Sequence, residues 1–287
     1  RGAVRHAARR GGEGGGMTAA APRPLRVALG EYDIGWHDPG ASLERARALV
    51  ADAARAGARL VVLPEMATTG FTMDRSQATP LAGGHAARLA EIAGESGVWL
   101  IASVAATEPV TSGGGGGESE RTRAVNAALV ADPSGATVAV YRKQKLFAFA
   151  GEHEHYSPGD APVVVTIEGV RIAPLVCYDL RFPELFRAVA RDADAFVLVA
   201  NWPAARRLHW DTLTRARAIE NQSYVVAVNR VGSGGGIAYD GGSFAWDPWG
   251  DRVPEAQTPA GVRLVTIDPG HVEDIRGRYP FLRDLKL

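Results

Sequence analysis

The fold is decided by the stretch Ile172-Ala173-Pro174-Leu175-Val176-Cys177-Tyr178-Asp179-Leu180-Arg181-Phe182-Pro183-Glu184. Its apolar first half predicts a buried strand that ends at Cys177, the only cysteine in the sequence. Charged and turn-forming residues follow, and Pro183 is a plausible first residue of a helix. This order would hold the Cys177 side chain at the end of a sheet, where a helix N-terminus would favour a thiolate. The alternative is a buried structural cysteine, because free cysteines are among the most buried residues.

Length and composition limit what the protein can be. The 287 residues fit one large α/β domain or two small ones, and a hydrophobic content of 46% is enough for a core. Lys+Arg and Asp+Glu both number 32, so no basic excess points to nucleic acid. No apolar run approaches the roughly 18 residues that a membrane span needs. A single cysteine excludes an internal disulfide and fits a reducing compartment, so we expect a cytoplasmic protein without a membrane partner.

Two segments differ in composition from the rest. The sequence up to Gly16 is rich in Gly, Arg and Ala and lacks the apolar centre of a signal peptide. We expect residues 1–22 to be a disordered extension, with Met17 as the natural start, and residues 23–287 to be the folded domain. The glycine run at 113–117 predicts an expanded surface loop, because no strand-to-helix context supports a phosphate-binding loop there.

Outward from Cys177, hydrophobic patterning predicts alternating strands and helices. Two hairpins interrupt the alternation, which indicates a mixed sheet with helices packed outside it, in a single α/β domain. Residues 151–160 are too polar and turn-rich for regular structure, and the tail after Asp268 is expected to dock rather than to fold alone. The expected helices are 43–56 with Ser42 as its N-cap, 86–95, one from Pro183, and 207–221. The expected strands are 25–30, 59–64, 98–104, 124–131, 137–141, 163–167, 170–176, 195–200, 224–229, 244–246 and 262–267.

Glu65, Lys143 and Cys177 lie at or just past the ends of predicted strands. Strand ends converge at one edge of a sheet, so we expect these side chains to meet. A cysteine nucleophile needs a base, which can be a carboxylate whose pKa is raised by burial. It also needs positive charge where an oxyanion forms, and a lysine supplies that charge. The three residues therefore indicate acyl transfer through a thiol, and the alternative is a solvated acid and lysine at loop starts.

Three segments resemble the signature segments of the nitrilase, or carbon-nitrogen hydrolase, superfamily. They are Leu63-Pro64-Glu65, Tyr141-Arg142-Lys143-Gln144-Lys145-Leu146-Phe147 and Val176-Cys177-Tyr178-Asp179-Leu180-Arg181-Phe182-Pro183-Glu184. Residues 215–221 also resemble the family's later helix-strand segment, so the likeness runs from about Leu25 to Asp268. It implies a four-layer αββα sandwich with mixed sheets and amide hydrolysis without a metal or organic cofactor. We also expect a homodimer.

The resemblance implies a role for each residue of the three segments. Glu65 is similar to the general base of the family and Cys177 to its nucleophile. Lys143 matches the catalytic lysine because it opens the Lys-x-(His/Lys)-Leu-Phe pattern. Lys145 is a rival, since it stands where many members have histidine. The backbone N–H of Tyr178 would join the Lys143 ammonium in an oxyanion hole.

A second glutamate orients the lysine and the substrate in this family. Glu152 resembles that residue, and Glu154 is the neighbouring alternative, which is less well placed relative to Ser157-Pro158-Gly159. No nucleic acid or membrane partner is implied, only a small-molecule amide substrate.

Residues 150–160 and 201–210 are similar to the bacterial omega-amidase branch, which hydrolyses the terminal amide of 2-oxoglutaramate and 2-oxosuccinamate. Such a substrate needs a cation for its remote carboxylate, a role that suits the planar guanidinium of arginine. Arg206 is the first choice, Arg207 and Arg181 are alternatives, and Trp202 is a further candidate for substrate binding. Other small amides, N-carbamoyl compounds and deaminated glutathione remain alternative substrates.

Overall fold

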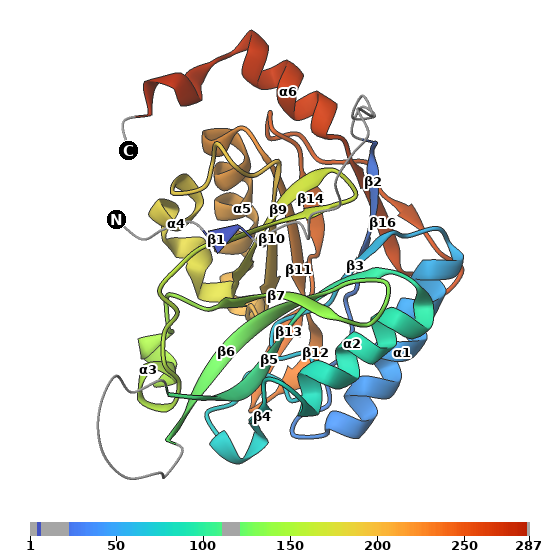
Figure 1. Cartoon of the computed structure of the whole chain (residues 1–287), viewed down its shortest axis with the longest axis vertical. Coiled ribbons are helices and arrows are strands. Elements are labelled where there is room, and N and C mark those ends of the chain that lie inside the picture. The colour runs from blue at the N-terminus through green and yellow to red at the C-terminus, as the bar shows by residue number, and fades with distance from the viewer. Residues whose placement is uncertain (1–4, 7–22, 111–120, 286–287) are drawn as a thin grey trace, which may run out of the picture.

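Two β-sheets pack face to face at the centre of the molecule, and helices cover both outer faces (Figure 1). The computed structural model describes residues 5–6, 23–110 and 121–285. The predicted four-layer αββα sandwich is confirmed, with mixed parallel and antiparallel pairing in both main sheets.

The larger sheet has eight strands and contributes the ends of β3 and β7 to the site described below. Its centre is parallel and its margins are antiparallel. In spatial order its strands are β15 (Ala256–Gln257), β16 (Arg263–Ile267), β2 (Leu25–Leu29), β3 (Leu60–Val62), β5 (Trp99–Pro109), β6 (Thr122–Ala131) and β7 (Thr137–Arg142), with β4 (Thr79–Pro80) beside β5.

The smaller sheet has six strands and contributes the ends of β9 and β10. In spatial order they are β1 (Arg5–His6), β8 (Val163–Ile167), β9 (Val170–Val176), β10 (Ala195–Ala200), β11 (Tyr224–Asn229) and β14 (Phe244–Trp246). A separate hairpin consists of β12 (Val231–Gly234) and β13 (Ile237–Asp240).

Helices α1 and α2 pack on the larger sheet, and α4 and α5 pack on the smaller one. The α-helices are α1 (Pro39–Arg55), α2 (Gly84–Ser96), α3 (Glu152–His155), α4 (Pro183–Arg187), α5 (Arg207–Asn221) and α6 (Pro269–Arg278). The 3-10 helices are η1 (Arg75–Gln77), η2 (Ala148–Ala150), η3 (Cys177–Arg181), η4 (Ala204–Arg206) and η5 (Phe281–Asp284).

Alternate residues of the larger sheet enter different cores. On β3, Leu60 and Val62 pack into the core between the two sheets, whereas Val61 packs toward α1 and α2. Val27 and Ala28 on β2 divide in the same way. Burial on both faces explains why β3 is a continuous apolar run rather than an alternating one.

The predicted N-cap of the first helix was wrong. The helix begins at Pro39, and the Asp38 side chain accepts a hydrogen bond from the Ala41 N–H at 3.0 Å. Proline fits the first helical position because its missing N–H has no partner there anyway. Ser42 lies within the first turn instead, where its hydroxyl donates to the Asp38 carbonyl at 2.8 Å and accepts from the Gly35 N–H at 3.0 Å.

Two segments contain helices that the sequence did not predict, one within residues 151–160, which were expected to be irregular, and one in the tail after Asp268, which was expected to dock. Residues 152–155 form the single turn α3, which follows Gly151 at a φ of +76°. The tail after Asp268 contains α6, because the Asp268 carboxylate accepts from the Gly270 N–H and Pro269 occupies the first helical position.

Two predictions fall largely outside the described residues. The glycine run at 113–117 lies within 111–120, and most of the predicted disordered segment lies within residues 1–4 and 7–22. Within that segment, Arg5–His6 form β1, which pairs in parallel with Val163 and Val164 of β8 and departs from the predicted disorder. Among the described residues, no helix has the length and apolar character needed to cross a bilayer.

Candidate active site

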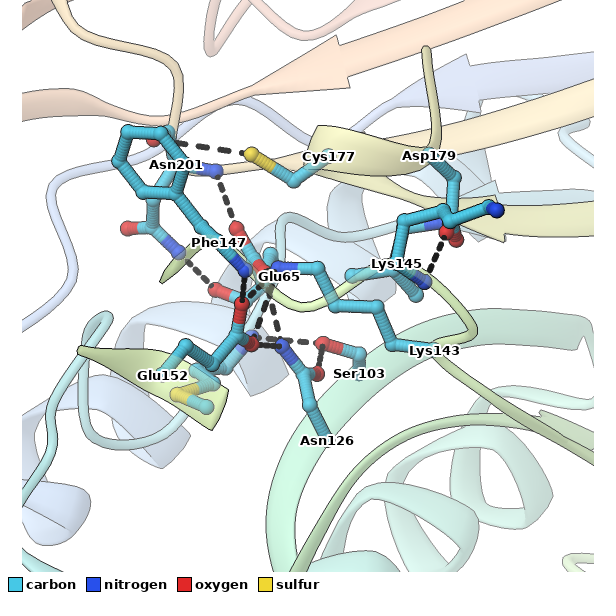
Figure 2. A network of polar contacts seen from close by, with 12 residues as sticks. Glu65, Ser103, Asn126, Lys143, Lys145, Phe147, Glu152, Cys177, Asp179 and Asn201 are labelled. Carbon is cyan, nitrogen blue, oxygen red and sulfur yellow. Dashed lines mark hydrogen bonds and ion pairs between the residues drawn. The ribbon is translucent and has the colours of Figure 1, made fainter. Parts of the chain in front are cut away.

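Four strand ends bring the predicted catalytic side chains together between the two sheets (Figure 2). Glu65 follows β3 and Lys143 follows β7, both in the larger sheet. Cys177 follows β9 and Asn201 follows β10, both in the smaller sheet. The convergence expected from the sequence is therefore present, although it joins two sheets rather than one edge of a single sheet.

Lys143 lies between two carboxylates. Its Nζ donates to Glu65 Oε1 at 2.9 Å and to Glu152 Oε1 and Oε2 at 3.0 and 2.9 Å, and the three side chains are fully buried. Burial alone would lower the pKa of Lys143, but the charges of Glu152 and Glu65 outweigh burial and raise the pKa above its ordinary value. The lysine is therefore an ammonium fixed in a site without bulk water.

Neither of the two rival residues, Lys145 for the lysine and Glu154 for the second glutamate, belongs to this buried cluster. Lys145 is about a third exposed, and its Nζ lies 3.4 Å from Glu184 and 4.8 Å from the centre of the Phe182 ring. Glu154 is exposed, and its one ion pair within the described part of the chain is with His153 at 3.9 Å. Glu152, in contrast, also accepts from the Phe147 N–H at 2.6 Å, which ties the lysine site to the following loop.

Asn126 connects the two glutamates. Its Nδ2 donates to Glu65 Oε1 at 2.8 Å and to Glu152 Oε1 at 3.1 Å, and its Oδ1 accepts from Ser103 Oγ at 3.0 Å. The Ser103 hydroxyl in turn accepts from the Met66 N–H at 2.8 Å. All of these groups are buried, so the network leaves neither carboxylate free to rotate away from Lys143.

Cys177 lies on a strained turn. Its φ of +44° is in the left-handed region, which a residue other than glycine adopts at a cost of about 1–3 kcal/mol. It is the first residue of η3, and its Sγ lies 3.9 Å from the Asn201 carbonyl oxygen. The side chain lines a cavity and is partly exposed to it, so the alternative of a fully buried structural cysteine does not apply.

The expected thiolate was wrong. Burial raises the pKa of the Cys177 thiol well above its usual range, the Glu65 carboxylate raises it further, and Lys143 only partly opposes them. The element behind Cys177 is the short helix η3 rather than an α-helix, so it provides less dipole than the prediction assumed. The surroundings of Cys177 therefore favour a neutral thiol beside the Lys143 ammonium.

A cavity of about 340 Å³ lies over Cys177 and Lys143. Its walls are largely aromatic and include Trp36, Phe71, Phe147, Tyr178, Trp202 and Tyr239. Arg181 and Arg206 are the cations on this wall, beyond the buried Lys143. A cavity lined by a thiol, an ammonium and two guanidinium groups suits a small polar molecule that carries a negative charge.

Of the residues predicted to bind substrate, Arg206, Arg181 and Trp202 line this cavity. The Arg206 guanidinium lies 5.4 Å from the centre of the Phe147 ring, and the Trp202 Nε1 donates to the Arg206 carbonyl at 2.8 Å. Arg181 lies over the Trp202 ring at 4.9 Å and contacts His209 Nδ1 at 3.1 Å. Arg207 is not part of the cavity wall, because it pairs with Asp211 at 2.9 Å and Asp240 at 3.4 Å.

Three residues at the site were missed from the sequence. Asn126 is an isolated polar residue within an apolar strand, which was the available signal. Asn201 follows β10 directly, as Glu65 and Cys177 follow β3 and β9, and its backbone N–H donates to Glu65 Oε2 at 2.9 Å. Asp179 is wholly buried among three hydrogen-bond donors, and no sequence pattern distinguishes it from a solvated turn residue.

Comparison with known proteins agrees with this arrangement. The family described as carbon-nitrogen hydrolase matches residues 26–277. Omega-amidase YafV of Escherichia coli (strain K12) is 37% identical over 262 residues, which cover 91% of this chain and 96% of that protein. The 2-oxoglutaramate amidase of Bacillus subtilis (strain 168) is 30% identical and covers 89% of this chain and 95% of its own length.

Among solved structures, XC1258 from Xanthomonas campestris is a similar one, with a TM-score of 0.81 and 35% identity. The similarity covers 92% of this chain and 98% of that chain. XC1258 is described as a CN-hydrolase superfamily protein with an arsenic adduct in its active site.

Proposed function

Because this chain belongs to the carbon-nitrogen hydrolase family and is an amidohydrolase, we propose that Cys177, Glu65 and Lys143 carry out its reaction. The observation that carries the proposal is the position of the Lys143 ammonium, held by Glu65 and Glu152 beside the cavity that Cys177 lines. In the proposed reaction the protein hydrolyses the terminal amide of a short 2-oxo dicarboxylic acid monoamide to the acid and ammonia.

The first half of the proposed reaction forms a thioester. Cys177 Sγ attacks the amide carbon while its proton moves to the Glu65 carboxylate, and the carbonyl electron pair moves onto oxygen. Collapse of this intermediate breaks the carbon–nitrogen bond, and the proton on Glu65 passes to the departing nitrogen, which leaves as ammonia. A neutral resting thiol supports this order, because the proton transfer and the attack occur together.

The second half releases the acid. A water molecule attacks the thioester carbon while Glu65 takes its proton. The carbon–sulfur bond then breaks, and Glu65 returns the proton to sulfur. The enzyme regains its starting form, and the water has supplied the hydroxyl of the new carboxylic acid.

Lys143 and the backbone N–H of Tyr178 stabilise the oxyanion in both halves. The ammonium is already fixed by Glu65 and Glu152, so little reorganisation is needed when the negative charge forms. A preorganised donor of this kind contributes about 3–4 kcal/mol, or roughly a hundred- to thousandfold in rate.

The substrate class rests on charge. A 2-oxo dicarboxylic acid monoamide carries its reacting amide at one end and a carboxylate at the other, and Arg206 and Arg181 face the cavity that would hold it. Among the described residues, no carboxylate lies within ion-pair distance of the Arg206 guanidinium, which leaves it free for a substrate carboxylate. The names of the two curated relatives, an omega-amidase and a 2-oxoglutaramate amidase, point to the same substrate class.

The test is ammonia release from a panel of amides at matched concentration. The proposal expects 2-oxoglutaramate and 2-oxosuccinamate to be hydrolysed with the highest kcat/KM, ahead of glutamine and an N-carbamoyl amino acid. A preference for deaminated glutathione or for an N-carbamoyl compound would contradict the proposed substrate class but not the amidase activity.

We also propose that the protein is a cytoplasmic homodimer. The single cysteine is free, as a reducing compartment requires. Ile219, Trp249 and Phe281 expose 47, 47 and 60% of their surface around one cavity, and exposed apolar side chains grouped in this way are typical of protein interfaces. Light scattering after size exclusion tests the dimer, since Trp249→Asp should then yield a monomer.

A further inference from the structure

The candidate site is assembled from two sheets that share no strand. Lys143 follows β7 of the larger sheet, and Cys177 with the Tyr178 backbone follows β9 of the smaller sheet. An oxyanion held by both the Lys143 ammonium and the Tyr178 N–H therefore depends on the distance between the two sheets. Hydrogen bonds are directional, so hydrogen bonds between the two segments can fix that distance more closely than apolar packing alone.

Asp179 accepts buried hydrogen bonds that join these two segments. Its Oδ2 accepts from the Tyr141 hydroxyl at 2.8 Å and from the Val176 N–H at 3.0 Å. Its Oδ1 accepts from the Lys145 N–H at 2.9 Å, which Figure 2 shows. Tyr141 and Lys145 stand two residues before and two residues after Lys143, and Val176 immediately precedes Cys177.

We propose that Asp179 is a positioning residue that fixes the lysine segment against the nucleophile turn, and so sets the spacing of the two oxyanion donors. This inference rests on the proposed function, because it assigns Asp179 a role in the same reaction. It touches neither substrate nor reacting atoms and acts through Lys143 and Tyr178.

The environment of Asp179 supports this role. The side chain is wholly buried, and burial raises its pKa to about 6, whereas the hydrogen bonds from Val176 and Lys145 and the charge of Lys143 favour the carboxylate. Near neutral pH it is therefore a carboxylate with three donors directed at its two oxygens. Two of these donors come from the larger sheet's segment and one from the nucleophile turn, so losing the acceptor loosens both sides together.

The experiment compares Asp179→Asn with wild type and with Asp194→Asn. The amide introduced by Asp179→Asn would present an N–H₂ group where Oδ2 or Oδ1 now accepts, so at least one contact becomes repulsive. Asp194 is a matched control, because it is also a buried acid that binds an arginine and a backbone N–H, but it precedes β10 at the end away from Asn201. The measurements are kcat and KM for ammonia release, the melting temperature, and the rate at which iodoacetamide alkylates Cys177.

For Asp179→Asn we expect kcat to fall about a hundredfold, which is the loss that a displacement of about 1 Å in an oxyanion donor would cause. The KM should change less than about threefold. Alkylation of Cys177 should continue at near the wild-type rate, because it does not require an oxyanion hole. Asp194→Asn should melt at a lower temperature and keep the wild-type kcat.

Several results would overturn the inference. A wild-type kcat in Asp179→Asn, a rise in KM that accounts for the loss, or an equal loss of kcat in Asp194→Asn would each show that Asp179 has no positioning role. If Asp179→Asn does not fold, Tyr141→Phe is the variant that tests the proposal, because it removes the hydroxyl that donates to Asp179 and leaves the carboxylate in place. It should lower kcat without changing KM, and an unchanged kcat refutes the proposal. The wild-type rate tests the proposed function separately, whereas the ratio of variant to wild type tests Asp179.

Discussion

Lys143 and Lys145 are two positions apart in the sequence, but their side chains lie in different surroundings. Lys143 is buried between two carboxylates, whereas Lys145 is partly solvated beside Glu184. Sequence left both as candidates, because a Lys-x-Lys pair does not reveal which side chain points inward. The path of the chain after β7 decides which of the two lysines is buried, and only the structure shows that path.

Replacing each lysine by alanine should separate their roles. Lys143→Ala is expected to lower kcat about a hundred- to thousandfold, because the variant loses the proposed oxyanion donor. It should also lower the melting temperature, since Glu65 and Glu152 are left buried side by side without a cation. Lys145→Ala is the matched control and should keep kcat within about twofold, because an exposed ion pair contributes little. The opposite ranking of the two variants would show that the lysines have been assigned wrongly.

Arg206 differs from its neighbour Arg207 in having no carboxylate partner among the described residues and in facing the cavity. Arg206→Ala should lower kcat/KM for 2-oxoglutaramate about ten- to a hundredfold through KM, since one charge-assisted contact contributes roughly 1.5–3 kcal/mol. An uncharged amide of similar length should be spared. Arg207→Ala is the control and should leave both substrates unaffected. Equal losses on the two substrates in Arg206→Ala would indicate a structural role instead.

At the scale of elements, the strand ends explain how the site could be found in the sequence. Apolar runs ending at Glu65, Lys143 and Cys177 identify the ends of β3, β7 and β9, and those side chains do meet. Asn126 left only the signal of an isolated polar residue in an apolar strand, and Asp179 left none, because the hydrogen bonds that give them their roles are to residues 26 to 61 positions away in sequence. The sequence also could not predict the direction in which the pKa of Cys177 shifts, because that shift depends on burial and on Glu65 rather than on the local helix.

The start of α1 offers a test of an element whose cap was misassigned. Asp38→Ala removes the acceptor for the Ala41 N–H and should destabilise the protein by about 1 kcal/mol. Asp38→Asn is the control and should be close to wild type, because asparagine caps helices as well as aspartate does. The measurement is the midpoint of urea unfolding. An equal loss in the two variants would show that the charge of Asp38, rather than its capping bond, is what stabilises α1.

At the scale of the whole molecule, the two-sheet sandwich was predictable from the family resemblance and not from the strands themselves. Buried strands of both sheets are equally apolar, so the pattern alone indicated one mixed sheet. The helix α6 was missed because its cap, Asp268-Pro269, stands in a polar segment with little apolar periodicity. The proposed domain limits, the compartment and the oligomer remain predictions.

Removing residues 1–16 tests the proposed domain limits. The deleted part includes β1, whose only described pairing is with Val163 and Val164, so we expect a change in melting temperature of less than about 3 °C, equivalent to roughly 1 kcal/mol. The kcat should be unchanged, since no residue of the candidate site is removed. A fall of several degrees would show instead that the segment docks on the domain and belongs to it.

The central claim is that Cys177 is the nucleophile of an amidase, and ammonia release by Cys177→Ala tests it most directly. The variant removes one sulfur atom from a site that is otherwise held by Glu65, Lys143 and Asn126, so it should keep the wild-type melting temperature. On 2-oxoglutaramate, where the wild-type protein is expected to turn over, the variant should release no ammonia above the buffer background. Ammonia release by the folded variant at a substantial fraction of the wild-type rate would contradict the account.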